Sequence, residues 1–272
     1  MLRTYKMKEL NYLQELIKEG PLSWAVIRAT EYEVLSDIKM KKPILDIACG
    51  NGSFSQILFK RKNEVECAID ILDKEVRQAR NRKIYKRALV ADAAKLPFKG
   101  SSFATVFSNG SFEHMDEIDK VLLEASRVLK MGGHLIITVP ASSFSRNLLG
   151  FTILQKLGFS KLANLYSVLL NRSFAHKNLW NDKTWQNRLK KAGLELNYVK
   201  KYNFKYTVWL HEVLLITAIS SIIFKKISGR FFLLPKLRKV TSPLIYSLLN
   251  PVFELSKRKN SSSSMLLIAV KK

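Results

Sequence analysis

From residue 43 onward, short apolar runs alternate with longer stretches of helical character. This alternation predicts parallel strands joined by right-handed crossovers, with helices on both faces of the sheet. Five runs are predicted to be buried strands: residues 43–48, 65–70, 87–92, 103–109 and 134–140. A helix with a sixth strand at 182–204 and a final strand at 263–272 extend this core. The pattern therefore predicts an α/β fold.

Three segments lie outside this α/β pattern. Residues 1–42 are predicted to form N-terminal helices that pack across the sheet edge or over the site. Residues 141–181 and 205–262 are predicted insertions that mix basic residues with aliphatic and aromatic runs, and the first contains no acidic side chain. Both are expected to leave the sheet at the carboxyl ends of strands, so they are predicted to build the substrate site or its roof.

Charge is distributed unevenly along the 272 residues. The chain carries 46 lysines and arginines against 22 acidic residues, a formal net charge of +24. Residues 1–139 hold 23 basic and 18 acidic side chains, whereas residues 140–272 hold 23 basic and four acidic ones. An anionic partner has to be considered: a nucleic acid, a membrane surface or a phosphorylated substrate.

Composition disfavours several classes of protein. With 47% hydrophobic residues the chain can bury a core and is not disordered. Two cysteines, Cys49 and Cys67, supply neither a disulfide framework nor a four-ligand zinc site, so a reducing compartment and no metal site are expected. The first thirty residues lack the apolar run of a signal peptide, and no stretch has the roughly 18 apolar residues of a spanning helix. A cytoplasmic location is expected.

Three successive strand ends carry residues suited to a ligand, which in open parallel sheets binds outside the carboxyl ends of the strands. The first strand leads into the turn Gly50–Asn51–Gly52, where missing side chains let a ligand approach the backbone. Asp70 can hold two ribose hydroxyls, and Asp92 can accept from a purine amine. Either aspartate alone is typical of a helix N-cap. Together the strand ends present the groups that an adenosine ligand needs.

Five sequence motifs add to this pattern: ILDIACGNGSF (44–54), AIDIL (68–72), VADAAKLPF (90–98), FATVFSNGSFEHMDEID (103–119) and RVLKMGGHLIITVP (127–140). In this order they resemble the class I S-adenosylmethionine-dependent methyltransferases, in particular the quinone and small-molecule methyltransferases. The resemblance spans about residues 24–140 and the last strand. It implies a Rossmann-like, doubly wound sheet of seven mostly parallel strands with an antiparallel last strand, and S-adenosylmethionine as cofactor.

The resemblance also implies residues that bind the methionine part of the cofactor. Asp46 would orient the glycine turn or reach the methionine amino group, and the backbone from Ala48 to Gly52 would pack against the methionine. Ala48 departs from the family, which often has glycine there, and it slightly crowds the turn. Ser108 and Asn109, past the fourth strand, would border the sulfonium and the acceptor.

The adenosine part of the cofactor has its own implied residues. Asp70 would hold the ribose hydroxyls, with Ile71 against the adenine ring. Asp92 would bind the adenine amine, and Ala93 would line the same pocket.

Methyl transfer from a sulfonium is an in-line displacement, for which a protein mainly supplies alignment and a water-poor site. A hydroxyl acceptor must also lose a proton. His114, just past the fourth strand, and His176, in the first insertion, are candidate catalytic bases, because imidazole titrates near neutral pH. His211 beside Glu212 is a weaker third candidate. Each histidine has a structural alternative, which for His114 is to close the loop beneath the substrate.

The two insertions leave two explanations open. They form a cap that buries its apolar residues internally, or an interfacial surface that docks on anionic lipid. The second explanation assigns six basic residues to the headgroups: Lys225, Lys226, Arg230, Lys236, Arg238 and Lys239. Nucleic acid is an unexpected partner, because the basic residues lie among Leu, Ile and Val rather than among exposed aromatics and glycines.

The sequence therefore predicts an S-adenosylmethionine-dependent methyltransferase that acts on a hydrophobic, lipid-linked or glycolipid-type small acceptor, with transfer to oxygen. It is expected in the cytoplasm or peripherally attached to the inner face of the membrane. Two alternatives stay open, a methyltransferase for a soluble sugar or natural product and a non-catalytic membrane-associated assembly factor that retains the fold. The intact residues Asp46, Gly50, Gly52, Asp70 and Asp92 argue against the second, which has no need of them.

Overall fold

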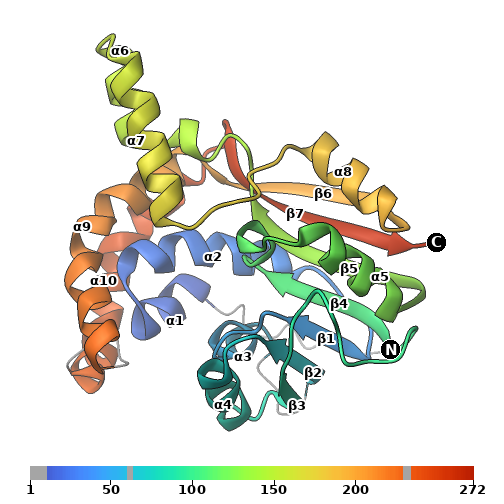
Figure 1. Cartoon of the computed structure of the whole chain (residues 1–272). Helices are drawn as coiled ribbons and strands as arrows, with labels where there is room; N and C mark the ends of the chain where they lie inside the picture. Colours follow the sequence, from blue (N-terminus) through green and yellow to red (C-terminus); the bar gives the residue numbers. More distant parts are fainter. Residues whose placement is uncertain (1–10, 60–63, 229–233) are drawn as a thin grey trace, which may run out of the picture. The chain divides into compact units, whose positions relative to one another are not determined.

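The computed structural model describes residues 11–59, 64–228 and 234–272 (Figure 1). The chain forms two compact units. One consists of Val34–Tyr202 and Ser261–Lys272, and it contains the sheet. The other combines the described residues up to Glu33 with Asn203–Asn260, and it is mainly helical.

Seven strands form one sheet in the order β3-β2-β1-β4-β5-β7-β6. Their bounds are β1 Ile44–Ile47, β2 Val65–Asp70, β3 Tyr85–Val90, β4 Phe103–Asn109, β5 Leu129–Pro140, β6 Leu194–Phe204 and β7 Ser262–Lys271. Strands β1 to β5 pair in parallel, and β7 runs antiparallel to β5. The predicted Rossmann-like, mostly parallel sheet with an antiparallel last strand is confirmed.

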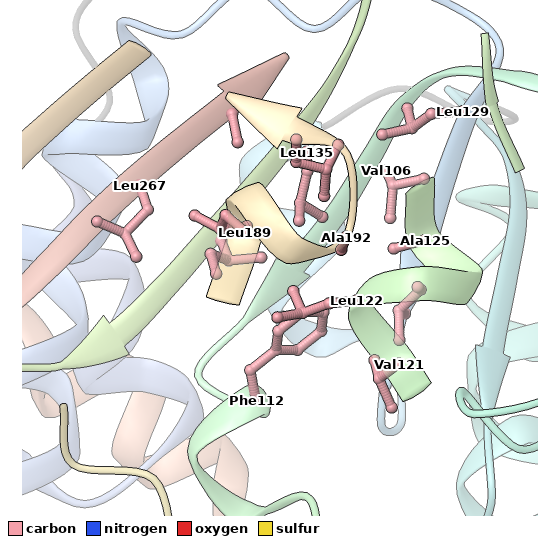
Figure 2. Packing of buried hydrophobic residues seen from close by; sticks show 14 of the residues in the cluster. Val106, Phe112, Val121, Leu122, Ala125, Leu129, Leu135, Leu189, Ala192 and Leu267 are labelled. Carbon is pink, nitrogen blue, oxygen red and sulfur yellow. The ribbon is translucent and has the colours of Figure 1, made fainter. Parts of the chain in front are cut away.

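The helices of the sheet-containing unit follow the strands in the predicted rhythm. They are α3 Ser53–Phe59, α4 Asp73–Asn81, α5 Ile118–Val128, α6 Leu149–Lys156, α7 Ser160–Ser173 and α8 Asp182–Lys191, with short 3-10 turns η1 Phe112–His114 and η2 Ser145–Asn147. Side chains of each strand alternate between two apolar layers, so that Val106 and Phe107 of β4 belong to opposite ones. Figure 2 shows the layer in which Leu122 of α5 and Leu189 of α8 pack with Val106.

The first predicted insertion folds as η2 followed by a hairpin of α6 and α7. Two asparagines fasten the base of this hairpin to the rest of its unit. Nδ2 of Asn147 donates to the carbonyl oxygens of Ser261 at 3.2 Å and Ser262 at 3.1 Å. After α7, Nδ2 of Asn178 donates to the carbonyl oxygens of Phe112 at 2.9 Å and Met115 at 2.7 Å.

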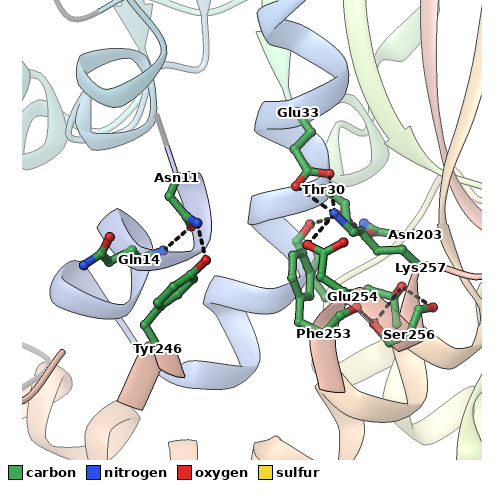
Figure 3. A network of polar contacts seen from close by, with 12 residues as sticks. Asn11, Gln14, Thr30, Glu33, Asn203, Tyr246, Phe253, Glu254, Ser256 and Lys257 are labelled. Atoms are coloured by element: carbon green, nitrogen blue, oxygen red, sulfur yellow. Dashed lines mark hydrogen bonds and ion pairs between the residues drawn. The ribbon is translucent and has the colours of Figure 1, made fainter. Parts of the chain in front are cut away.

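The second unit consists of α1 Tyr12–Glu19, most of α2 Leu22–Ser36, α9 Lys205–Ser228 and α10 Pro235–Ser256. Polar contacts join segments that are far apart in the sequence (Figure 3). Nζ of Lys257 lies 3.1 Å from Oε1 of Glu33 and 2.8 Å from Oε1 of Glu254. The N-terminal helices and the second insertion thus fold together. Among the described helices, none has the length and apolar character needed to cross a bilayer.

Candidate active site

A cavity of about 410 Å³ lies where β1 and β2 end, beside the loop that follows β3. This volume is typical of small-ligand pockets, which span roughly 300–1,000 Å³. Five of the residues predicted to bind the cofactor line it: Ala48, Asp70, Ile71, Asp92 and Ala93. His114 of η1 lines the same cavity. The structure therefore brings together the predicted adenosine residues and one of the two candidate bases.

Asp70 and Asp92, two of the aspartates that line this cavity, stabilise turns and are not helix N-caps. Oδ2 of Asp70 accepts a hydrogen bond from the backbone N–H of Gly50 at 2.8 Å, and its Oδ1 accepts from that of Leu72 at 3.0 Å. Helix α4 begins only at Asp73, with Leu72 at its N-cap. Asp92 lies in a loop, where its Oδ1 accepts from the N–H of residue 94 at 2.8 Å. Each carboxylate oxygen has a second lone pair and can accept another hydrogen bond from a ligand.

Ile71 lies between the cavity and solvent and is 68% exposed. An apolar side chain in this position offers a surface that a flat aromatic ring can cover. The apolar area removed from water in this way makes the free energy of binding more favourable. With the acceptor oxygens of Asp70 and Asp92 at the same cavity, the residues fit an adenosine group: carboxylates for hydroxyl and amine donors, and an apolar face for the base.

The glycine turn contains three residues in the left-handed region, Ala48 at φ +57°, Gly50 at +53° and Gly52 at +74°. Only glycine adopts this region without strain, which explains why glycine suits position 48. A Cβ added to Gly52 would lie 2.9 Å from Cε2 of Tyr85, whereas one on Gly50 would have no neighbour closer than 3.9 Å. Gly52 is therefore needed for packing against β3, and Gly50 leaves space in the turn.

Asp46 and Asn51 bond to groups of the protein itself rather than lining the cavity. Oδ2 of Asp46 accepts from Oγ of Ser55 at 2.6 Å and from the hydroxyl of Tyr85 at 2.8 Å. Burial raises the pKa of Asp46 to about 6, although both hydrogen bonds lower it. Oδ1 of Asn51 accepts from the N–H of Ser53 at 3.0 Å. In the structure, these two side chains hold the turn and the start of α3.

Ser108 and Asn109 bridge neighbouring strands. Oγ of Ser108 donates to the carbonyl oxygen of Ile47 in β1 at 2.9 Å, and Nδ2 of Asn109 donates to Oγ1 of Thr138 in β5 at 2.7 Å. Neither residue lines the cavity. Their polar groups stabilise the sheet edge on which the site is built.

His114 and His176 stack on each other, with ring centroids 5.7 Å apart. Nδ1 of His114 lies 3.0 Å from the carbonyl oxygen of Ala175, and Nε2 lies 3.7 Å from Oε1 of Glu113. Only a protonated nitrogen can donate to a carbonyl, so in the neutral ring Nδ1 carries the proton and Nε2 the free lone pair. The carboxylate of Glu113 is positioned to stabilise the ring once Nε2 takes up a proton.

His176 lies in an aromatic cluster with Phe144 and Phe174, whose ring centroids are 5.2 Å and 5.6 Å from its own. Burial, with a smaller contribution from His114, lowers the pKa of His176 to about 4. Its buried Nδ1 has no hydrogen-bond partner among the described residues. His176 is therefore neutral near pH 7 and a weak base.

The third candidate, His211, belongs to the helical unit. Its Nδ1 lies 2.8 Å from the carbonyl oxygen of Ser23, and burial lowers its pKa. In this unit His211 ties α9 to the start of α2.

The loop after β4 supplies lining residues that the strand-end rule does not identify, Met115, Asp116 and Glu117. Lys177 pairs with Asp116 at 2.7 Å, so this loop is also held by the segment after α7. The acid-rich stretch that contains them was visible within the motif at 103–119. Its contribution to the cavity depends on η1, which turns the chain back toward the strand ends.

The basic residues expected at lipid headgroups differ in their surroundings. Lys236 and Lys239 are exposed. Arg238 is half-buried, and its Nε donates to the carbonyl oxygen of Ile17 at 2.9 Å, so it stabilises the helical unit. Arg230 and the side chains of Lys225 and Lys226 lie outside the described part of the chain.

Comparisons with known proteins match part of the chain to methyltransferases. Residues 45–137 match a family model described as a methyltransferase domain. A ubiquinone/menaquinone biosynthesis C-methyltransferase from Paraburkholderia phymatum is 31% identical over 177 residues, which are 59% of this chain and 69% of that protein. A malonyl-acyl carrier protein O-methyltransferase from Hamiltonella defensa is 30% identical over 109 residues, 40% of this chain. This match spans only 42% of that protein's length.

Solved structures show the same fold. A methyltransferase structure from Thermotoga maritima superimposes with a TM-score of 0.56 at 16% identity, covering 94% of this chain and 92% of that one. At this identity the likeness concerns the fold alone.

Proposed function

We propose that this chain methylates a hydrophobic small-molecule acceptor at oxygen. The chain belongs to the class I S-adenosylmethionine-dependent methyltransferases and uses their cofactor. The observation that carries the proposal is the cavity in which Asp70, Ile71 and Asp92 lie beside His114. When bound, the cofactor supplies an electrophilic methyl group on a positively charged sulfur. Asp70 would accept from the ribose hydroxyls, Ile71 would cover the adenine, and Asp92 would accept from its amine.

The aromatic cluster beside the cavity supports a hydrophobic acceptor. His176, Phe144 and Phe174 pack around one another next to His114, and Phe144 is buried. A neutral ring nitrogen that has no hydrogen-bond partner in the described part of the chain indicates surroundings poor in water, which favour methyl transfer over hydrolysis. The name of the quinone-biosynthesis relative is consistent with an apolar acceptor for that protein.

Of the two candidate bases, we assign proton removal to His114. Its Nε2 carries the lone pair, Glu113 lies close enough to stabilise the imidazolium, and the ring lines the cavity. A pKa of about 4 makes His176 a poor base near neutral pH, where a base with a pKa close to the working pH is most effective. We assign His176 the role of an apolar wall that positions the His114 ring.

Replacement of His114 by asparagine tests this assignment. The asparagine amide can still donate to the carbonyl of Ala175, but it cannot take up a proton. We expect turnover to fall by roughly 10²- to 10⁴-fold, the usual contribution of a general base, with cofactor affinity unchanged. His176→Phe keeps an aromatic ring in the cluster and is the matched control, with turnover within a few-fold of wild type. Equal losses in both variants would contradict the assignment.

A lipid-linked acceptor and peripheral contact with an anionic membrane are part of the same proposal. The formal charge of +24 and the exposed Lys236 and Lys239 support attraction to anionic headgroups. The cytoplasmic leaflet carries the negative surface potential that draws basic segments, so we assign the contact to the inner face of the membrane.

The acceptor class can be tested by radiolabelled methyl transfer. Full-length protein is incubated with methyl-labelled S-adenosylmethionine and either a lipid extract or the water-soluble fraction of host cells, with Asp70→Asn as the control. We expect label in the organic phase with wild-type protein and none with the variant. Label confined to soluble products would favour the sugar or natural-product alternative, and no transfer by a cofactor-binding protein would favour the non-catalytic one.

A further inference from the structure

We propose that the tip of the α6–α7 hairpin, residues 155–162, docks on the surface of an anionic lipid bilayer. Figure 1 shows this hairpin extending away from the sheet of its own unit. The inference rests on the proposed membrane contact and gives that contact a location, one that differs from the basic segment at 225–239 considered from the sequence.

The hairpin has an apolar surface that the other described residues of its own unit do not cover. Helix α6 has no buried residue, and α7 buries only Ala163. All residues of the tip are exposed, including the large apolar side chains Leu157 (63%), Phe159 (54%) and Leu162 (52%). Because exposed apolar groups clustered in this way mark interaction surfaces on soluble proteins, the tip is a candidate contact site.

The same hairpin is basic and free of acidic side chains. Lys156 and Lys161 flank the apolar residues of the tip, and Arg172 lies at the other end of α7. No ion pair with a described residue involves any of these three cations. The apolar side chains of the tip can insert among the acyl chains of an anionic bilayer, and the flanking lysines can contact the phosphates of its headgroups.

Charge and shape favour a bilayer over the other occupants. A second copy of this chain, with its own charge of +24 and an equally acid-free hairpin, would be repelled. An acidic protein would need a patch of roughly 800 Å² on each partner for a stable interface. A projecting tip of two helix ends instead suits shallow insertion, for which a few apolar side chains and adjacent cations are enough.

The base of the hairpin connects this surface to the cavity. The backbone N–H groups of Lys177 and Asn178 donate to the carbonyl oxygen of Glu113 at 2.7 Å and 3.0 Å. Helix α7 has 14 residues and is therefore about 21 Å long. A docked tip would hold the loop that lines the cavity at a fixed distance from the membrane, in position to receive an acceptor that resides there.

Vesicle co-sedimentation of the full chain tests the proposal. Phosphatidylcholine vesicles with phosphatidylglycerol are compared with vesicles of phosphatidylcholine alone. We expect binding to the anionic vesicles only, and a loss of about tenfold or more in the partition coefficient when Leu157, Phe159 and Leu162 are all replaced by serine, because binding scales with the apolar area inserted. Lys156→Gln with Lys161→Gln should also reduce binding and make it less dependent on salt.

Leu123→Ser is the matched control, since Leu123 lies on α5 of the same unit and is 54% exposed, as Phe159 is. It should bind vesicles as wild type does. Wild-type sedimentation of the triple variant, or equal binding to neutral vesicles, would overturn the proposal. The proposal would also be overturned if wild-type protein bound no vesicles and the triple variant had a different molar mass by light scattering. The tip would then join copies of the chain.

The proposed function can fail separately from this inference. Titration of S-adenosylmethionine into the triple variant should give wild-type affinity, because the tip residues do not line the cavity. Tip-dependent vesicle binding by a protein that transfers no methyl group would support the docking surface and reject the proposed reaction.

Discussion

Replacement of Asp46 by asparagine is predicted to remove a pH dependence of the free energy of unfolding that the Asp46 carboxyl group causes. The carboxyl group is buried at the end of β1, and burial raises its pKa from 3.8 to about 6. A carboxyl whose pKa is raised by folding stabilises the folded state fully below pH 3.8, and this stabilisation is lost as the pH rises through about 6. This rise in the pKa of Asp46 corresponds to about 2–3 kcal/mol, because each tenfold change in proton affinity is equivalent to about 1.36 kcal/mol.

The free energy of unfolding, measured by urea titration at a series of pH values, checks this prediction. Asparagine keeps an oxygen that can accept from Ser55 and Tyr85 but does not titrate. The variant should therefore gain about 2–3 kcal/mol relative to wild type between about pH 4 and about pH 7. In Ser55→Ala, loss of a hydrogen bond that lowers the pKa of Asp46 should move the transition to higher pH. Parallel profiles of wild type and Asp46→Asn would show that Asp46 does not impose this pH dependence.

Three further predictions concern the turn and the aromatic cluster. Gly52→Ala should lower the free energy of unfolding by about 2 kcal/mol or more in urea titrations, because position 52 has φ +74° and the new Cβ would lie 2.9 Å from Tyr85. Ala48→Gly should raise it by about 0.5–1 kcal/mol in the same assay, since it relieves a left-handed alanine; a loss of stability would contradict this. His176 should stay neutral in NMR titrations down to about pH 5, because its pKa is lowered to about 4. Its contribution to stability is then lost as the pH falls from 6.5 through 4, so His176→Phe should tolerate acid better than wild type.

Much of the sheet could be predicted from the sequence, because each central strand is an apolar run bounded by polar segments. The third strand was predicted to begin at residue 87, but β3 begins at Tyr85 and ends at Val90. It is an edge strand whose Lys86 and Arg87 are exposed, so basic side chains interrupt the apolar pattern. Tyr85 belongs to the strand because it pairs with Val65 of β2, and its hydroxyl also donates to Asp46, a residue far away in the sequence.

The site could be predicted in part. Strand ends of a parallel sheet meet at one edge, which is why residues chosen on that ground, such as Asp70 and Asp92, line one cavity. The same rule cannot separate a side chain that faces a ligand from one that bonds to its own sheet, as Ser108 does. Nor can it find Asp116, whose position depends on the turn of η1.

The association of the N-terminal helices with the second insertion could not be predicted from the sequence, for a related reason. Arg238 bonds to the backbone of Ile17, and Lys257 pairs with Glu33. Such contacts depend on tertiary packing, and local hydrophobic patterns carry no signal for them.

The proposed function depends on binding of S-adenosylmethionine to the cavity through Asp70, which isothermal titration measures. S-adenosylmethionine and S-adenosylhomocysteine are titrated into wild-type protein and into Asp70→Ala, each purified with and without mild detergent. We expect binding through Asp70 to give saturable one-to-one binding to wild type, which is lost in an Asp70→Ala variant that is still folded by circular dichroism. Absence of binding to folded wild-type protein in both preparations, or wild-type affinity in the variant, would contradict it.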